Sequence, residues 1–132
     1  MGAERMNGWM LACLVGIGGS AGALLRYGAS RWNARRKGKP HLATLAVNLT
    51  GSLLLGLMAG GNLRVSHAEV YAFAGTGIMG GLTTYSTLNV QKAEMARARN
   101  WRQLAGYAAA TYLGGWAAFA AGWLLGRAFW HQ

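Results

Sequence analysis

Acidic residues, cysteine and proline are almost absent from this chain of 132 residues. Three Asp and Glu residues stand against 13 Lys and Arg, and there is one cysteine and one proline. The lone Cys13 excludes an intrachain disulfide, and the length allows one domain at most. Charged residues make up 12% of the chain, about half of what soluble proteins carry. This scarcity of charge argues against an ordinary soluble domain.

The net charge of +10 first suggests a nucleic-acid-binding protein, but the distribution of charge argues against that partner. The basic residues form short clusters between uncharged apolar runs, instead of following one exposed face. A soluble four-helix bundle would need a charged face on each helix, which these runs lack. Each run has about 20 residues, enough to cross a bilayer. We therefore predict an all-α membrane protein whose four transmembrane helices cover residues 9–25, 42–61, 70–90 and 104–125.

The basic residues also predict the orientation of these helices. Three lie on one side of the membrane, namely Arg5, Arg64 and Arg127. The other ten lie in the connections between the first and second and between the third and fourth helices: Arg26, Arg31, Arg35, Arg36, Lys37, Lys39, Lys92, Arg97, Arg99 and Arg102. Because basic loops stay in the cytoplasm, we expect both connections inside and both termini outside. The first helix lacks a small-residue cleavage site, so we expect no removable signal peptide.

Histidines and carboxylates do not gather into a catalytic or metal-binding constellation. All of them lie at or beyond the ends of the apolar segments: His41, His67, His131, Glu4, Glu69 and Glu94. We therefore expect a protein that is not an enzyme. A small proton-coupled multidrug exporter depends on a glutamate inside its first span, and here that span has none. The exporter remains a weaker alternative.

Uncharged polar residues recur inside the apolar segments. Thr44, Asn48 and Ser52 are spaced by four residues and share one helix face, as do Tyr107 and Thr111. An asparagine inside the membrane is costly without a partner. For Asn48 we weigh two interpretations equally: a hydrogen bond that joins two helices, or a pore-lining amide. For the pair in the fourth segment, helix packing is slightly the stronger interpretation.

The third segment combines weak helix formers with a polar cluster, in the stretch GGLTTYSTLN at 80–89. Four glycines between positions 75 and 81 predict a broken helix at mid-membrane. A break frees carbonyls, which are tolerated where they face protein or hold a cation. A kinked packing helix does not need the hydroxylic residues that follow. A broken, polar and uncharged segment therefore predicts an ion path.

Three stretches of the chain resemble the Fluc (CrcB) family of bacterial fluoride channels. They are GGSAGALLRY at 18–27, TLAVNLTGSLLLG at 44–56 and GIMGGLTTYSTLN at 77–89, in the family's order. The resemblance implies a fluoride-selective ion channel in the bacterial inner membrane, through which fluoride leaves the cytoplasm passively. It further implies four-helix subunits in an antiparallel dimer, with a structural Na⁺ at the dimer centre that is not transported.

The resemblance also implies roles for single residues. Backbone carbonyls of Gly80 and Thr83 would hold the Na⁺, and Arg26 matches the family's arginine at the end of the first helix. The fluoride path would be lined by Asn48, Thr84, Tyr85, Ser86, Thr87, Leu88, Tyr107 and Thr111. Family members have phenylalanine where this chain has Tyr85 and Leu88. That departure bears on conduction and leaves the fold and the Na⁺ site untouched.

The physical chemistry of fluoride agrees with these implied residues. Fluoride is small and strongly hydrated, so a pore must replace its water with neutral N–H and O–H donors and ring edges. We favour a homodimer. The unequal distribution of basic residues leaves open a heterodimer with a chain of opposite bias, in which this subunit conducts partly or not at all.

Overall fold

The computed structural model describes residues 7–130, and within that range the chain is helical and has no strand. Three long helices are each apolar enough to cross a membrane: α1 (Gly8–Arg35), α2 (Pro40–Gly60) and α7 (Trp101–Trp130). Shorter elements lie between α2 and α7: α3 (Leu63–Ser66), α4 (Ala68–Val70), the π-helix η1 (Tyr71–Met79), α5 (Gly80–Leu82) and α6 (Ser86–Arg97). The predicted all-α class is confirmed. Glu4, Arg5 and His131 lie outside the described residues.

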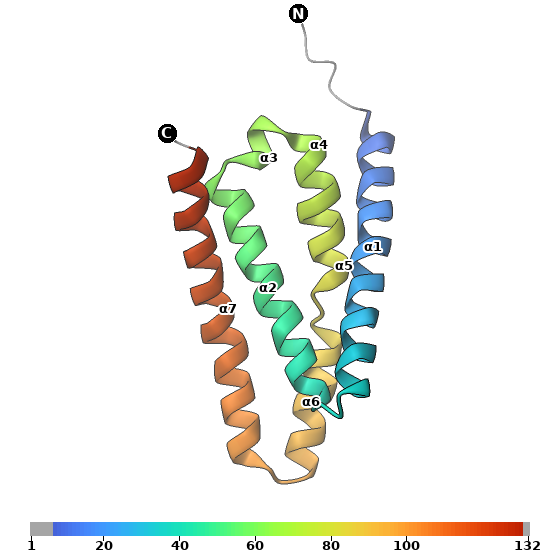
Figure 1. Ribbon diagram of the computed structural model, residues 1–132, viewed down its shortest axis with the longest axis vertical. Coiled ribbons are helices and arrows are strands. Elements are labelled where there is room, and N and C mark those ends of the chain that lie inside the picture. Colours follow the sequence, from blue (N-terminus) through green and yellow to red (C-terminus); the bar gives the residue numbers. More distant parts are fainter. Residues whose placement is uncertain (1–6, 131–132) are drawn as a thin grey trace, which may run out of the picture.

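The chain runs back and forth along one long axis. In Figure 1, α1 and the segment from α4 to α6 run in one direction, and α2 and α7 return in the other. The start of α1 and the end of α7 lie at one end, and the α1–α2 and α6–α7 connections lie at the opposite end. The most extensive contacts join α1 to η1 and α2 to α7. The molecule is therefore built from two packed helix pairs.

The helix ends follow from local chemistry. Asn7 caps α1 by accepting a hydrogen bond from the backbone N–H of Trp9, and Pro40 opens α2, where its missing N–H costs nothing. The connections turn through residues with positive φ, Lys37 at 55° and Arg99 at 52°. Helix α1 continues ten residues beyond the predicted end at position 25, because charge ends an apolar run without ending a helix.

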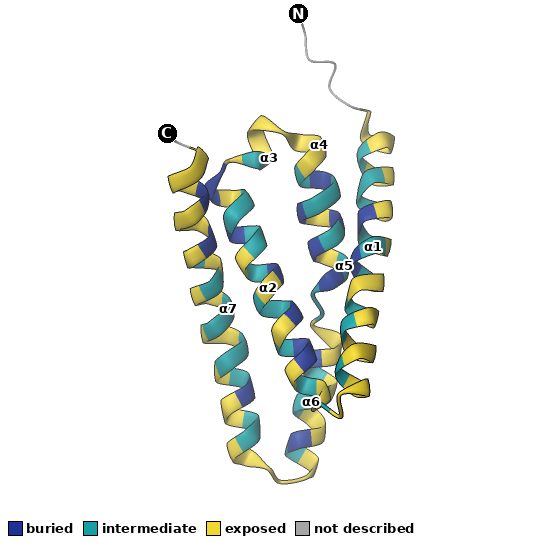
Figure 2. Cartoon of the chain, viewed as in Figure 1, coloured by how far each residue is buried: buried dark blue, intermediate teal, exposed yellow. Residues whose placement is uncertain are grey.

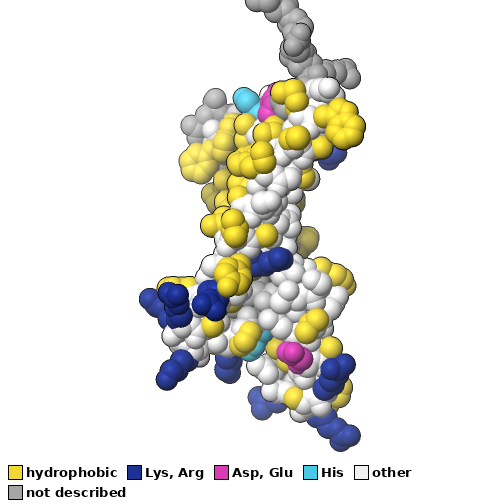
Figure 3. Space-filling view, turned by 90° about the vertical axis from the view of Figure 1, so that its right-hand side faces the viewer, with side chains coloured by type: hydrophobic (Ala, Val, Ile, Leu, Met, Phe, Trp, Pro, Cys, Tyr) yellow, Lys and Arg dark blue, Asp and Glu magenta, His cyan; other side chains and the backbone are white. Residues whose placement is uncertain are grey.

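The charged end of the molecule extends beyond what a bilayer can cover. Helix α1 has 28 residues and is about 42 Å long at 1.5 Å per residue, against a hydrocarbon layer of about 30 Å. On the face shown in Figure 3, hydrophobic side chains run along the upper half, and most Lys and Arg side chains lie in the lower half. The lower half is the end with the two basic connections.

Glycines form the two seams along which the helix pairs meet. A Cβ atom on Gly22 of α1 would collide with the carbonyl of Ile78, and one on Gly81 would collide with the carbonyl of Gly19. In the other pair, a Cβ on Gly122 of α7 would collide with the carbonyl of Leu53. Figure 2 shows that buried residues concentrate where the paired helices face each other. Small residues thus allow backbones to approach closely, as expected in a membrane.

The third segment is broken, but the break follows the glycines instead of lying among them. Gly75 and Gly77 belong to η1, and Gly80 and Gly81 belong to the helical turn α5. The helix ends at Thr83, whose ψ of 153° is extended, and α6 begins three residues later. Three of the four glycines are buried or packed against neighbours, so their lack of a side chain is used mainly for packing. The break lies where other residues replace the lost hydrogen bonds.

Candidate functional site

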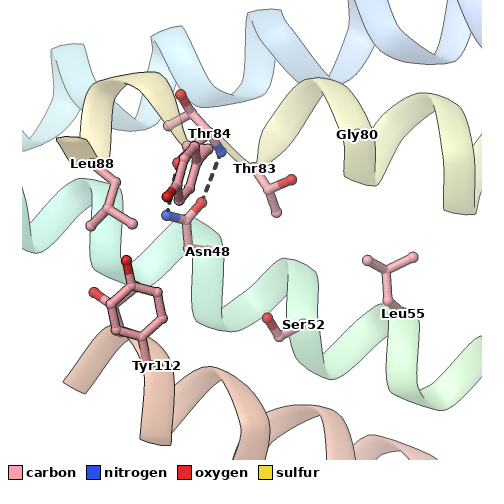
Figure 4. A pocket seen from close by; sticks show the side chains of 10 residues that line it. Asn48, Ser52, Leu55, Gly80, Thr83, Thr84, Leu88 and Tyr112 are labelled. Carbon is pink, nitrogen blue, oxygen red and sulfur yellow. Dashed lines mark hydrogen bonds between the residues drawn. The ribbon is translucent and has the colours of Figure 1, made fainter. Parts of the chain in front are cut away.

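Asn48 of α2 takes over the hydrogen bonds of the broken helix. Its Nδ2 donates to the carbonyl of Thr84 at 3.2 Å, and the Thr84 backbone N–H donates to its Oδ1 at 2.9 Å (Figure 4). Backbone groups in a membrane need such partners, because lipid offers none. The amide of Asn48 therefore joins two elements, and its second N–H remains able to donate.

The same arrangement frees the carbonyl of Gly80. In a continuous helix the Thr84 N–H would bond to Gly80, but here it donates to Asn48. The Thr83 N–H and hydroxyl both donate to the Met79 carbonyl, at 3.0 and 2.8 Å. The Thr83 carbonyl accepts a long hydrogen bond of 3.5 Å from Nη1 of Arg26. The break thus presents backbone oxygens beside an open space, since nothing lies within 4 Å of a Cβ built on Gly80.

A groove of about 490 Å³ lies beside the break, between α2, α6 and α7. Ser52, Leu55 and Tyr112 line it together with seven of the predicted site residues: Asn48, Gly80, Thr83, Thr84, Tyr85, Leu88 and Thr111. No charged side chain is among these ten lining residues. The hydroxyl of Thr111 is buried and has no hydrogen-bond partner in the described part of the chain. The groove therefore offers neutral donors, one of them unused.

The Thr84 side chain starts the next helix. Its hydroxyl oxygen accepts a hydrogen bond of 3.3 Å from the backbone N–H of Thr87, in the first turn of α6, and so satisfies a donor that the helix itself cannot. It also donates to the Thr87 hydroxyl at 3.2 Å and lies 3.4 Å from that of Ser86. The 12-residue α6 consequently directs its N-terminal, partially positive end toward the break.

Three predicted path residues lie away from the groove. Thr87 lines a separate cavity of about 210 Å³ together with Arg26 and Thr44, and Ser86 is exposed. Tyr107 is only 4% exposed and lines no part of the groove. Helix geometry explains the positions of Ser86 and Thr87, because Tyr85 and Leu88 are three residues apart and share a face that these two residues do not occupy.

Tyr107 belongs instead to a buried hydrogen-bond chain. Its hydroxyl donates to Oε1 of Gln91 at 2.7 Å, and Nε2 of Gln91 donates to the Thr44 hydroxyl at 3.0 Å. Sequence reasoning missed Gln91. A signal existed, because Gln91 lies at helical spacing between Leu88 and Met95, which are both buried. A polar residue within a buried stripe needs a partner, and Tyr107 supplies it.

Residues 13–123 match the sequence model of a family described as CrcB-like protein, Camphor Resistance (CrcB). The chain belongs to the CrcB family. The match includes every residue that lines the groove, and the resemblance found in the three sequence stretches is confirmed.

Relatives of this CrcB protein carry names that describe an activity. Fluoride-specific ion channel FluC 1 of Geobacillus kaustophilus is 46% identical over 114 residues, which are 86% of this chain and 95% of the relative. FluC 2 of Lactobacillus acidophilus is 38% identical over 109 residues, 77% of this chain and 86% of the relative. FluC 2 of Rhodococcus jostii is 38% identical over 115 residues, which are 87% of this chain and 95% of the relative. Together with the three apolar helices, the family shows a multi-pass membrane protein.

Proposed function

We propose that this chain is a fluoride-selective ion channel that lets fluoride leave the bacterial cytoplasm passively through the inner membrane. The observation that carries the proposal is the groove beside the helix break, lined by neutral donors and no charged side chain. The relatives named as fluoride-specific channels support the choice of ion. A channel of this kind performs no covalent chemistry, so the chain is not an enzyme.

Neutral donors suit fluoride because they replace its water without trapping it. The unpartnered hydroxyl of Thr111 and the second N–H of Asn48 can each donate to an anion in the groove. The N-terminal end of α6 adds a partial positive charge without a fixed cation. A fully charged side chain inside the groove would bind fluoride too tightly for rapid passage.

The open side of the groove requires a cover, because polar backbone does not face lipid. We propose that a second copy covers it in an antiparallel dimer, which also makes the third segment a full transmembrane crossing in a four-helix subunit. The open space at Gly80 and the exposed ring of Tyr85 lie on this side. The resulting pair would place two breaks against each other.

The backbone oxygens at the break are the groups that this chain would contribute to the implied Na⁺ site. The Gly80 carbonyl is free and fits a hard cation, whereas the Thr83 carbonyl already contacts Arg26, whose charge opposes one. A single chain therefore offers too few oxygens, and a symmetric pair doubles their number. When bound, Na⁺ supplies a fixed positive charge that links the two chains. Removal of Na⁺ should weaken the dimer in detergent, and an unchanged dimer would contradict the site.

Fluoride efflux from liposomes that contain only this chain tests the proposal. We expect rapid loss of fluoride down its gradient, no comparable loss of chloride, and no dependence on a proton gradient. Equal rates for the two anions would overturn the assignment. Dependence on a proton gradient would instead support the exporter, although the two glutamates in the described range are both exposed, outside α1, α2 and α7.

The identity of the dimer partner is testable through orientation in cells. Single cysteines placed near each terminus, in a Cys13→Ser background, can be labelled from outside or inside. A homodimer requires labelling from both sides in similar amounts, because antiparallel copies insert both ways. One-sided labelling would favour a heterodimer with a chain of opposite charge bias, as the excess of basic residues at one end would then predict.

A further inference from the structure

Lys92 lies next to the groove, where its ammonium contacts two of the tyrosines that line it. Its Nζ donates to the hydroxyl of Tyr112 at 2.8 Å and lies 5.1 Å from the centroid of that ring. It also lies 5.9 Å from the ring centroid of Tyr85. Both tyrosines line the groove, whereas Lys92 does not. The charge is therefore held at the boundary of the groove by two of its lining residues.

Helix geometry places the ammonium toward the connection end of the groove. Lys92 follows Leu88 by four residues and Tyr85 by seven, so the three share one face of the chain. The side chain is half-buried, and α6 continues from it toward the α6–α7 connection. An anion that approaches the groove from this end meets Lys92 before it meets Thr111 or Asn48.

The N–H donors of Lys92 and the O–H donor of Tyr112 are not all used in hydrogen bonds between these two residues. An ammonium carries three N–H donors, and the phenol oxygen of Tyr112 accepts only one of them. The Tyr112 hydroxyl, which accepts from Lys92, still has its own hydrogen to donate. Within residues 7–130 no carboxylate forms an ion pair with Lys92, so its neutral partner leaves its positive charge uncompensated.

We propose that Lys92, positioned by Tyr112 and Tyr85, is a capture site for small inorganic anions at the connection end of the groove. The site rests on the proposed channel function and deepens it, because it raises the local fluoride concentration without placing a fixed charge inside the groove. Its position at the boundary lets the anion leave toward the neutral donors. Lys92 thereby sets the concentration range in which the channel works.

Fluoride flux as a function of fluoride concentration tests this site with three variants and one control. Lys92→Met should raise the half-saturating concentration by about tenfold and leave the maximal rate within about twofold. Lys92→Arg keeps the charge and should behave like the parent chain. Tyr112→Phe removes the positioning hydrogen bond and should give an intermediate shift. Arg97→Met is the matched control, an equal loss of charge on the exposed last turn of α6, and should change nothing.

The dependence of flux on ionic strength and a direct measurement of fluoride binding provide two further tests of the site. High ionic strength should erase the difference between Lys92→Met and the parent chain, because it screens an attraction of this kind. Equal flux curves for Lys92→Met and Arg97→Met at low fluoride would overturn the site. If the parent chain passes no fluoride, the proposed function fails separately. In that case, the ¹⁹F NMR line width of fluoride mixed with the purified chain tests the site independently of flux. Loss of the line broadening in Lys92→Met supports the site, and equal broadening in Lys92→Met and the parent chain overturns it.

Discussion

Gly80 and Gly81 are neighbours in the sequence but face opposite regions of the molecule. Gly81 lies in the seam with α1, where a side chain would collide with the backbone of Gly19. Gly80 faces the groove, where a side chain would meet open space. The seams and the groove thus use the same residue type for different reasons. In the seams glycine permits contact, and in the groove it leaves the backbone carbonyl accessible.

The comparison separates what holds the subunit together from what the subunit does. Apolar side chains gain little from packing on each other when lipid is the alternative, so close backbone contact stabilises the helix pairs. The groove contrasts with the seams, because it does not stabilise the subunit. Among the described residues, it leaves polar groups such as the Thr111 hydroxyl and the Gly80 carbonyl without partners, at a cost to the folded subunit. We interpret unsatisfied groups of this kind as the mark of an ion path.

The largest expected effect separates the two glycines directly. Gly81→Ala should destabilise the subunit by about 1–3 kcal/mol, because backbone atoms of α1 must move to admit the methyl group. Gly80→Ala should leave the isolated subunit folded and weaken only its pairing, because its methyl group would lie on the open side. Thermal unfolding and size-exclusion chromatography in detergent measure both. Equal loss of folded protein in the two variants would contradict the distinction.

The next effect concerns Asn48, which both lines the groove and joins α2 to the broken segment. Asn48→Ala leaves the backbone N–H and carbonyl of Thr84 unpaired, which should cost about 1–2 kcal/mol in total, because both hydrogen bonds are only partly buried. It also removes a groove donor, so fluoride flux should fall sharply. Ser52→Ala is the matched control, because Ser52 lines the same groove one turn away without bonding to the break in the described structure.

The outcome of that pair decides between the two interpretations of Asn48. Loss of stability with normal flux per folded protein would restrict Asn48 to the joining of two elements. Loss of flux beyond the loss of folded protein would give it a place in the ion path as well.

The sequence alone predicts the helical class and the family, and seven of the ten residues that line the groove are among those that the resemblance implied. Asn48 and Thr84 illustrate its limit. Their reciprocal hydrogen bonds join positions 36 residues apart, and no local pattern specifies such a pairing. The break was expected among the glycines, since propensity marks weak helix formers without showing what replaces their hydrogen bonds. Gln91 and Tyr112 were missed for the same reason, because their partners lie on other helices.

A smaller effect is expected at Thr111, where flux and stability should change independently. Thr111→Val removes a buried hydroxyl that has no partner in the described chain, so stability should stay unchanged or rise by about 1 kcal/mol. Flux should nevertheless fall, because the groove loses a donor. Thr111→Ser keeps the donor and should restore flux. A Thr111→Val channel with full flux would show that the hydroxyl plays no part in the path.

The smallest effect is expected at Tyr85, one of the two positions where the resemblance implies phenylalanine. Tyr85 is 68% exposed and Leu88 only 3%, although both touch the groove. Tyr85→Phe keeps the ring beneath Lys92 and should change stability by less than about 0.5 kcal/mol. Leu88→Phe must fit a ring between Met95 and Tyr107, at a cost of about 1–3 kcal/mol. If Tyr85→Phe alone raised flux severalfold, the tyrosine hydroxyl would be the feature that slows this channel.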